Sequence, residues 1–285
     1  MTKTKFVLTA HCPNRQGIVA AITAKIANLG CNILDLQQFD DVETNQFFAR
    51  IVFEHETLEK DAAKAEMAPV LIPFGGSWSL RRHGTRRKVM LLASKFDHCL
   101  GDLLYRWRSG ELNMDVVGVI SNHPRETYNN MTLGNVQFHY LPVTRDTKAE
   151  QEAQILALIE QTGAELVVLA RYMQVLSDDM AKALSGKCIN IHHSFLPGFK
   201  GAKPYHQAHT RGVKLIGATS HYVTGDLDEG PIIEQDVERI SHRDTPDDLI
   251  RKGRDIERRV LAGAVRAHLE DRVLLNGTKT IVFPA

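Results

Sequence analysis

From residue 89 onward, short apolar runs alternate with segments of helical periodicity, and this alternation restricts the fold more than any other feature of the chain. The first run, VMLLA at 89–93, contains no polar residue, which is typical of a strand that is covered on both faces. Further strands are predicted at 115–121, 138–141, 166–170 and 187–192, and helices at 100–107, 149–162 and 178–184. Strands and helices in this alternation form an open, doubly wound and mostly parallel sheet, so we expect an α/β domain.

The residues before this region follow another order. Strands are predicted at 5–12, 32–40, 46–53 and 77–82, and helices at 18–29 and 58–71. The resulting order β-α-β-β-α-β is that of a ferredoxin-like domain. We therefore expect a small domain at residues 1–82, a basic linker at 83–88 and a larger domain at 89–285.

The part of the chain after residue 192 is less regular. Segments 215–223 and 232–240 have the pattern of strands that extend the sheet in antiparallel fashion. A long helix is predicted to begin at Thr245 and Pro246. Threonine is a favourable capping residue, proline suits the first helical position, and the aspartates that follow lie near the positive end of the helix dipole.

Charge and composition narrow the possible functions. Lys and Arg number 35 against 34 Asp and Glu, so the chain has no strong field that would attract nucleic acid or a membrane surface. We interpret the basic run at 81–88 as a solvated linker, with an RNA contact as the alternative. No apolar run approaches the roughly 20 residues of a membrane helix, and the first residues lack the pattern of a secretory signal. The four scattered cysteines fit a reducing compartment. We expect a cytoplasmic protein that binds neither nucleic acid nor membranes.

The densest group of polar residues, NIHHSFLPG at 190–198, follows the strand predicted at 187–192. Ligands of open α/β sheets bind outside the carboxyl ends of the strands. Alternation along a strand directs Asn190 and His192 to the same side. An amide N–H can donate to an oxyanion and an imidazole can transfer a proton at neutral pH, so this pair is suited to acyl transfer. The alternative interpretation of residues 190–198 is a capped loop with a solvated histidine and no catalytic role.

A second polar group, HYVTGDLDEGP at 221–231, contains three carboxylates in a turn-rich loop. Such carboxylates are usually solvated, but one that approached His192 would hold the orientation of the imidazole. The histidines do not have the spacing of a zinc site, so no metal is expected. The segment after residue 93 has no glycine until Gly101, and therefore no glycine-rich turn for a phosphate group.

Together the two groups resemble the signatures of the formyltransferase family. NIHHSFLP at 190–197 is similar to the family's N-[IV]-H-x-S-[LF]-L-P motif, and 221–231 is similar to its second motif, in which an aspartate follows a histidine by seven residues. This resemblance, which covers about residues 88–280, implies catalytic roles for Asn190, His192 and Asp228.

The segment LARYMQVL at 169–176 resembles the loop that lines the pterin pocket in this family. The resemblance implies substrate contacts by Met173, Gln174, Val175, Leu176, Ser194, Lys203 and His221. Gln174 stands where the transformylases of the family have an arginine, so the chain departs from their pattern at this contact.

Members of the family take the formyl group from 10-formyl-tetrahydrofolate and differ in its acceptor. Water is favoured here because the chain lacks the phosphate-binding turn and a C-terminal domain of the kind that grips tRNA. The turn PNRQGIVA at 13–20 and the order of elements around it also resemble an ACT domain, which occurs in the water-using branch. The resemblance implies hydrolysis to formate and tetrahydrofolate without a cofactor, and formate supply for purine biosynthesis. A formyltransferase with a small-molecule acceptor and a non-catalytic folate or amino-acid sensor are the alternatives.

ACT domains commonly bind amino acids, so the resemblance implies an effector such as glycine or methionine. Its expected site is the first turn and the end of the first helix, at Asn14, Gln16, Gly17, Ile18 and Asn32. Such domains usually pair, so a homo-oligomer, a dimer or a tetramer, is expected.

Overall fold

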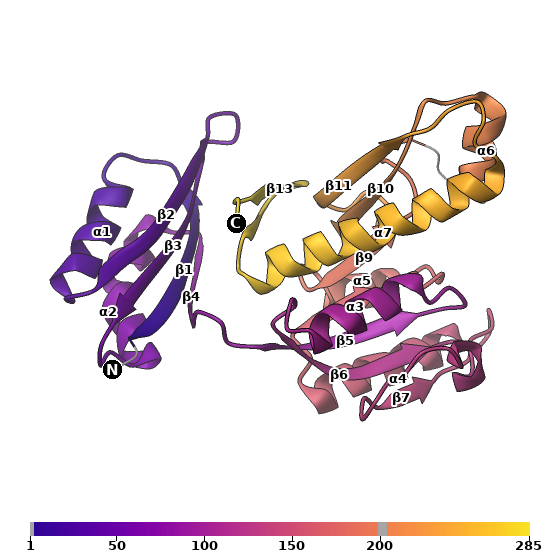
Figure 1. Cartoon of the computed structure of the whole chain (residues 1–285). Coiled ribbons are helices and arrows are strands. Elements are labelled where there is room, and N and C mark those ends of the chain that lie inside the picture. Colours follow the sequence, from indigo (N-terminus) through magenta and orange to yellow (C-terminus); the bar gives the residue numbers. More distant parts are fainter. Residues whose placement is uncertain (1–2, 199–203) are drawn as a thin grey trace. The chain divides into compact units, whose positions relative to one another are not determined.

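The computed structural model describes residues 3–198 and 204–285, and the chain divides into two compact units (Figure 1). The first unit contains the residues up to Thr85 together with Glu270–Asn276 and Ile281–Ala285, and the second contains Arg86–Leu269 and Gly277–Thr280. The sequence-based division assigned all of residues 89–285 to the second domain. By packing, the two C-terminal segments instead group with the first unit.

The first unit contains a four-stranded antiparallel sheet in the order β2-β3-β1-β4, with two helices on one face (Figure 1). Its elements are β1 (Thr4–Pro13), α1 (Ile18–Asn28), β2 (Asn32–Asp41), β3 (Gln46–His55), α2 (Lys60–Leu71), a short 3₁₀ turn (Ile72–Phe74) and β4 (Ser77–Arg82). Ile22 and Ile26 of α1 and Met67 of α2 are completely buried against Phe6 and Leu8 of β1. The predicted β-α-β-β-α-β order is therefore confirmed, because each apolar stripe meets the apolar face of the sheet.

The end of the chain forms a hairpin, β12 (Val273–Asn276) and β13 (Lys279–Val282), that the sequence did not predict. Leu274 and Phe283 pack against Phe48 of β3. Strand alternation directs Phe48 away from the face that meets the helices, so these C-terminal residues cover part of the other face. Nδ2 of Asn276 also donates to Asp41 Oδ2 at 2.6 Å.

The second unit contains a seven-stranded sheet in the order β11-β10-β9-β8-β5-β6-β7. Its strands are β5 (Arg87–Ala93), β6 (Met114–Ser121), β7 (Phe138–Tyr140), β8 (Leu166–Leu169), β9 (Cys188–His192), β10 (Leu215–Tyr222) and β11 (Ile232–Arg239). The strands from β9 to β7 are parallel, and β10 and β11 continue the sheet in antiparallel fashion, as predicted.

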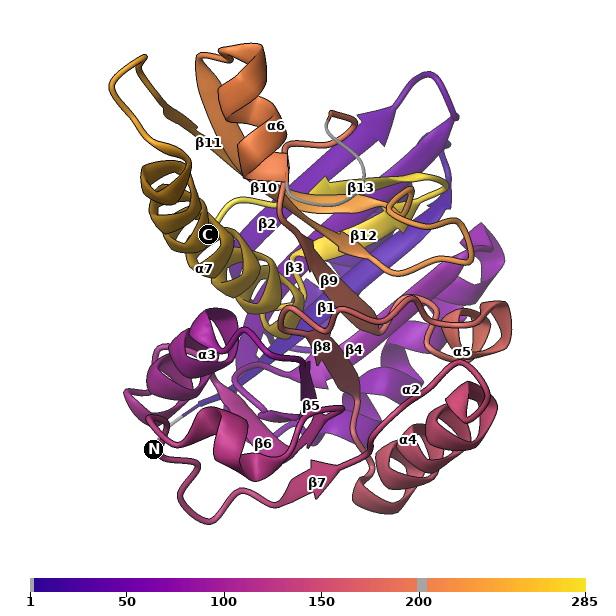
Figure 2. The ribbon, with the colours of Figure 1, turned by 90° about the vertical axis from the view of Figure 1, so that its right-hand side faces the viewer.

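Helices cover both faces of this sheet (Figure 2). They are α3 (His98–Arg108), α4 (Lys148–Thr162), α5 (Asp178–Ala183), α6 (Pro204–Arg211) and α7 (Pro246–Leu269), with a 3₁₀ turn at Arg125–Tyr128. Helices α3 and α7 lie on one face and α4 and α5 on the other. Thr245 and Asp248 form a reciprocal cap at the start of α7, which explains why this helix begins where the sequence predicted.

The carboxyl ends of the central strands meet at one edge of this sheet. Leu169 at the end of β8 is opposite Leu92 of β5 and Asn190 of β9. The antiparallel strand β10 brings His221 opposite Asn190. This edge therefore brings together polar segments that are distant in the sequence. Among the described residues, no helix is both long and apolar enough to cross a membrane.

Candidate active site

A cavity of about 240 Å³ opens at this edge of the second unit. It is lined by the residues that follow β8, by the end of β9, and by the end of β10 with the turn beyond it. Asn190, His192, His221 and Asp228 share this cavity with the segment Met173–Leu176. The two polar groups of the sequence and the segment that resembles a pterin loop thus line one space.

His192 and Asp228 form the polar centre of the cavity. Nδ1 of His192 lies 3.2 Å from Oδ2 of Asp228, and the two side chains are 7% and 17% exposed. Nε2 of His192 is buried and has no hydrogen-bond partner among the described residues. A histidine bound to a carboxylate through Nδ1 is held in one orientation and presents its other nitrogen for proton transfer.

The Asp228 carboxyl stays ionised in this setting. Burial alone would raise its pKa, but the hydrogen bond from His192 and the electrostatic effect of the nearby His192 and His221 rings outweigh burial and hold the pKa well below its ordinary value. The Asp228 backbone has φ 57°, a left-handed conformation that costs a non-glycine residue about 1–2 kcal/mol. Strain of this kind persists where the surrounding structure enforces it, as at functional sites.

Asn190 is oriented by His221. Nδ1 of His221 lies 2.9 Å from the carbonyl oxygen of Tyr222, so this nitrogen carries a hydrogen and donates it. With that hydrogen on Nδ1, Nε2 of His221 is the acceptor, and Nδ2 of Asn190 lies 3.3 Å from it. One N–H of the Asn190 amide is used in this contact, and the second stays available to a ligand.

The turn after β10 depends on Gly230. A Cβ at this position would lie 1.7 Å from the carbonyl oxygen of Tyr222 and 3.0 Å from Nδ1 of His221. Only glycine permits this close approach of the turn to the strand. The approach returns the chain beside His221, which places Asp228 within 3.7 Å of that ring.

The segment after β8 is fixed to its neighbours by hydrogen bonds. The backbone N–H of Met173 donates to Ser94 Oγ at 3.0 Å, and Ser94 donates to Asn122. The side chains of Met173 and Val175 are 50% and 55% exposed and line the cavity, as do Gln174 and the partly buried Leu176. An apolar wall beside a few polar groups is the usual composition of a site for a small-molecule ligand.

One predicted substrate contact, Ser194, does not line this cavity. Ser194 donates from Oγ to the carbonyl oxygen of Gly198 at 2.8 Å and lines a separate apolar cavity of about 400 Å³. Because the hydroxyl of Ser194 is already used in a hydrogen bond within its own loop, it does not take part in the polar group formed by Asn190, His192 and Asp228. Lys203 lies outside the described residues.

Arg171 is a cavity residue that the sequence analysis did not identify. It is 9% exposed and has φ 63°. Its guanidinium contacts His193 and Glu257, which lies on α7. An arginine that directly follows the apolar run LVVLA was the available signal, because a charge next to a buried strand needs a partner.

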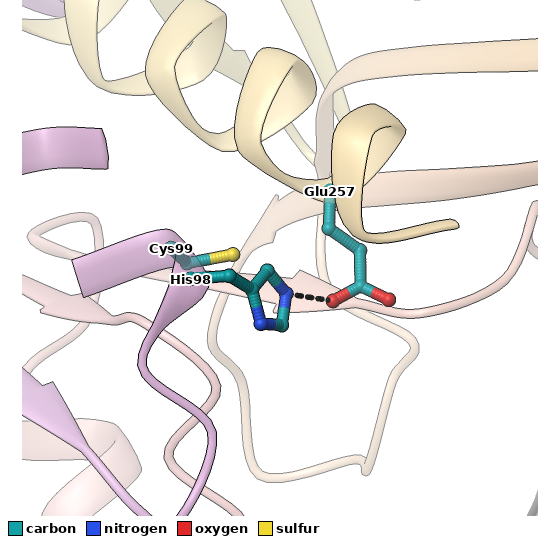
Figure 3. A group of neighbouring side chains, drawn as sticks. All are labelled: His98, Cys99 and Glu257. Carbon is teal, nitrogen blue, oxygen red and sulfur yellow. Dashed lines mark hydrogen bonds and ion pairs between the residues drawn. The ribbon is translucent and has the colours of Figure 1, made fainter. Parts of the chain in front are cut away.

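One group of potential metal ligands occurs among the described residues. His98 and Cys99 begin α3, and Glu257 faces them from α7 (Figure 3). Nε of Arg171, however, lies 3.2 Å from the same Glu257 oxygen that His98 contacts at 2.7 Å. Burial also raises the pKa of the Cys99 thiol well above its ordinary value. A permanent cation beside the carboxylate and a protonated thiol favour a hydrogen-bonded network over a metal centre.

Four of the residues predicted to hold an effector, Asn14, Gln16, Gly17 and Ile18, lie at the turn between β1 and α1. The fifth, Asn32, begins β2 opposite Glu54 of β3, at the other end of the sheet from Pro13, which is opposite Gln46. Gly17 has φ 92° and directly precedes α1, and Gln16 and Asn32 are exposed. The backbone N–H of Asn14 donates to the carbonyl oxygen of Asn45. Ile18 instead belongs to the core of the first unit, and the small hollow that it lines has no room for a water molecule.

Comparison with known proteins agrees with this architecture. The Formyl transferase family matches residues 87–265 and the ACT domain family matches residues 6–66. The formyltetrahydrofolate deformylase of Corynebacterium sp. (strain P-1) is 50% identical over 98% of both chains. That of Bacillus subtilis (strain 168) is 47% identical over 97% of this chain and 93% of its own. The crystal structure of the Burkholderia mallei deformylase superposes with a TM-score of 0.94 at 52% identity, over 99% of this chain and 100% of that one.

Proposed function

Because the chain belongs to the formyltetrahydrofolate deformylase family, we propose that the cavity at the carboxyl edge of the seven-stranded sheet is where water attacks the formyl group. The protein hydrolyses 10-formyl-tetrahydrofolate to formate and tetrahydrofolate. The observation that carries the assignment of the site is the free Nε2 of His192, on a ring whose Nδ1 contacts an ionised carboxylate.

The proton transfers are assigned to His192 and Asp228. Nε2 of His192 takes a proton from water as the oxygen attacks the formyl carbon, and Asp228 stabilises the imidazolium that forms. The same nitrogen then returns the proton to N10 of the folate as the C–N bond breaks. The products are tetrahydrofolate with a neutral amine and formic acid, which ionises to formate.

Asn190 is assigned to the developing oxyanion. The attack converts the formyl carbonyl to a tetrahedral alkoxide, which needs a donor that is already oriented. The second N–H of the Asn190 amide meets this need, because His221 accepts the first one. The apolar side chains of Met173, Val175 and Leu176 provide the wall against which the pterin ring packs.

The experiment that tests this assignment is formate release from 10-formyl-tetrahydrofolate by the purified protein, without an acceptor and with a chelator present. We expect release that Asp228→Asn abolishes. Release only after a small amine is added would favour the alternative of a formyltransferase. Folate binding without turnover would favour a non-catalytic sensor.

We further propose that the ACT domain binds glycine or methionine at the turn between β1 and α1. The support is the exposed position of Gln16 and Gly17 directly before the first turn of α1. Either amino acid should raise the melting temperature of the wild type. Gln16→Ala should remove that shift, whereas Gln38→Ala, at an exposed position of β2, should keep it.

Two further assignments accompany this proposal. We propose a homo-oligomer, a dimer or tetramer, which sedimentation of the purified chain would test. We also propose a cytoplasmic location, supported by the four cysteines, all of which are free thiols.

A further inference from the structure

Glu257 is the centre of a buried polar network in the second unit. Its side chain is 1% exposed and extends from α7 toward the start of α3 (Figure 3). Oε2 of Glu257 contacts Nε2 of His98 at 2.7 Å and Nε of Arg171 at 3.2 Å, and Oε1 accepts from the hydroxyl of Tyr205 at 2.7 Å. A carboxylate with this many partners is held in one position.

Arg171 extends the network toward the cavity. While Nε faces Glu257, Nη1 forms a hydrogen bond with Nδ1 of His193. A guanidinium can only donate, so Nδ1 of His193 must be the acceptor and its hydrogen lies on Nε2. Burial, the charge of Arg171 and the neighbouring His192 lower the pKa of His193 to about 4, whereas Glu257 and Asp228 act in the opposite direction.

His193 in turn lies against His192. The two rings stack with their centroids 5.0 Å apart and their planes at 19°. The face of His192 is therefore covered by a neighbour whose own position depends on Arg171. An unbroken series of contacts joins Glu257 to the ring that faces Asp228.

We propose that Arg171 and Glu257 are positioning residues for the hydrolysis, which hold His193 as a neutral Nε2–H imidazole against the face of His192. The stacked ring keeps His192 in the orientation that directs Nδ1 to Asp228 and Nε2 to the water. This inference rests on the role proposed above for His192. Neither Arg171 nor Glu257 contacts the reacting atoms in this scheme.

Two features of the backbone indicate that the fold is arranged around this network. Arg171 adopts φ 63°, which an arginine accepts only where its surroundings enforce it. Gly253 lies inside the continuous helix α7, although glycine is unfavourable inside a helix. A Cβ at Gly253 would lie 2.1 Å from the hydroxyl oxygen of Tyr205, so glycine is required for Tyr205 to reach Glu257.

The opposite charges of Arg171 and Glu257 make the pair interdependent. Burial alone would raise the pKa of Glu257, but the hydrogen bond from His98 and the charge of Arg171 outweigh it and lower the pKa. Removal of either charge would leave the other buried without compensation. A substitution that keeps the positive charge at position 171 but removes the planar guanidinium is therefore the sharpest test.

Arg171→Lys is such a substitution. Lysine retains a cation beside Glu257, but its single ammonium group cannot contact Glu257 and His193 at the same time as the planar guanidinium does. We expect kcat for formate release to fall about 10- to 100-fold, as for a small misplacement of a catalytic group, while KM changes little. The matched control is Arg259→Lys, at an exposed arginine on α7 that pairs with Asp236. It should change neither parameter.

A second readout follows His193 directly by nitrogen NMR of labelled imidazoles. In the wild type, His193 should show the Nε2–H tautomer and stay neutral between pH 5 and 8, a range above the pKa of about 4. In Arg171→Lys it should lose the fixed tautomer. Glu257→Gln, which keeps an acceptor for Tyr205, provides a second variant and should also lower kcat.

Wild-type kcat in a folded Arg171→Lys protein, or a wild-type His193 that becomes protonated near pH 6.5, would overturn the inference. If neither variant folds, the tautomer of His193 in the wild type decides. Loss of activity in Asp228→Asn together with normal activity in Arg171→Lys would refute this inference alone. Full activity of Asp228→Asn would instead refute the proposed function, while the NMR readout would still report on His193.

Discussion

Nδ1 of His192 lies 3.2 Å from Oδ2 of Asp228, and Nε2 of the same ring is buried without a partner among the described residues. A buried nitrogen that the protein leaves unpaired costs free energy unless a ligand or water completes it. The contact to Asp228 therefore prepares the ring for a proton that must come from the cavity side. Turnover should depend on the charge of Asp228 more than on its size.

Asp228→Asn is expected to lower kcat for formate release by about 1,000- to 10,000-fold, because an amide can hold the imidazole in the wrong tautomer. Its size is nearly unchanged, so the fold should be retained. The control is Asp179→Asn, an exposed carboxylate in the first turn of α5. A loss of less than about tenfold for Asp228→Asn would exclude the histidine–aspartate pair as the proton-transfer unit.

Asn190→Ala removes the proposed oxyanion donor and should lower kcat about 100- to 1,000-fold. KM should change little, because the interaction strengthens only as the carbonyl becomes an alkoxide. Asn130→Ala, at an exposed asparagine of the same unit, serves as the control. An increase in KM with unchanged kcat would show that Asn190 binds the folate but does not stabilise the transition state.

Gly230→Ala should disturb both stability and activity. The added Cβ would meet the carbonyl oxygen of Tyr222 at 1.7 Å, and overpacking of this kind typically costs about 1–3 kcal/mol. The turn that carries Asp228 must then move away from His221. Gly263→Ala in α7 is a matched control, since its Cβ would meet only the side chain of Glu234, at 3.4 Å. Chemical denaturation should show that Gly263→Ala is as stable as the wild type or slightly more stable. Equal stability of Gly230→Ala and Gly263→Ala would contradict the proposed clash at Gly230.

The sequence predicted most of the fold because its signals are local. An apolar run such as 89–93 or an isoleucine stripe such as that of α1 depends only on neighbours along the chain. Helix α6 was not predicted, because its segment PYHQAHTR buries few apolar residues. The hairpin of β12 and β13 was missed for a different reason, since its apolar residues pack against Phe48, which is distant in sequence.

The residues of the candidate active site differ in how far their positions could be predicted from the sequence. Strand alternation alone placed Asn190 and His192 on one side. The choice of Asp228 among three carboxylates came from the resemblance to the formyltransferase family, because its position depends on the pairing of β9 with β10 and on a left-handed backbone. No local pattern joins Arg171 to Glu257, so their contact required the packing of α7.

The stability of the protein should decrease between about pH 6.5 and about pH 4 because of His193. In the unfolded chain this ring takes up a proton near its ordinary pKa of 6.5, whereas in the folded protein burial, Arg171 and His192 lower that pKa to about 4. The unfolded state therefore binds more protons in this window, and the free energy of unfolding falls as the pH falls. Asp228 acts in a separate window, since its lowered pKa contributes stability that is lost only below its ordinary pKa of 3.8.

His193→Asn is the variant that isolates this effect, because its amide oxygen can accept from Arg171 but does not titrate. The free energy of unfolding of the wild type and of His193→Asn can be measured by chemical denaturation at pH 7, 6 and 5. The difference between the two values cancels the contribution of the other histidines, which both proteins contain. We expect the difference in unfolding free energy between the two proteins to shift in favour of the variant as the pH falls. A difference that stays constant from pH 7 to pH 5 would mean that His193 titrates alike in the folded and unfolded chains.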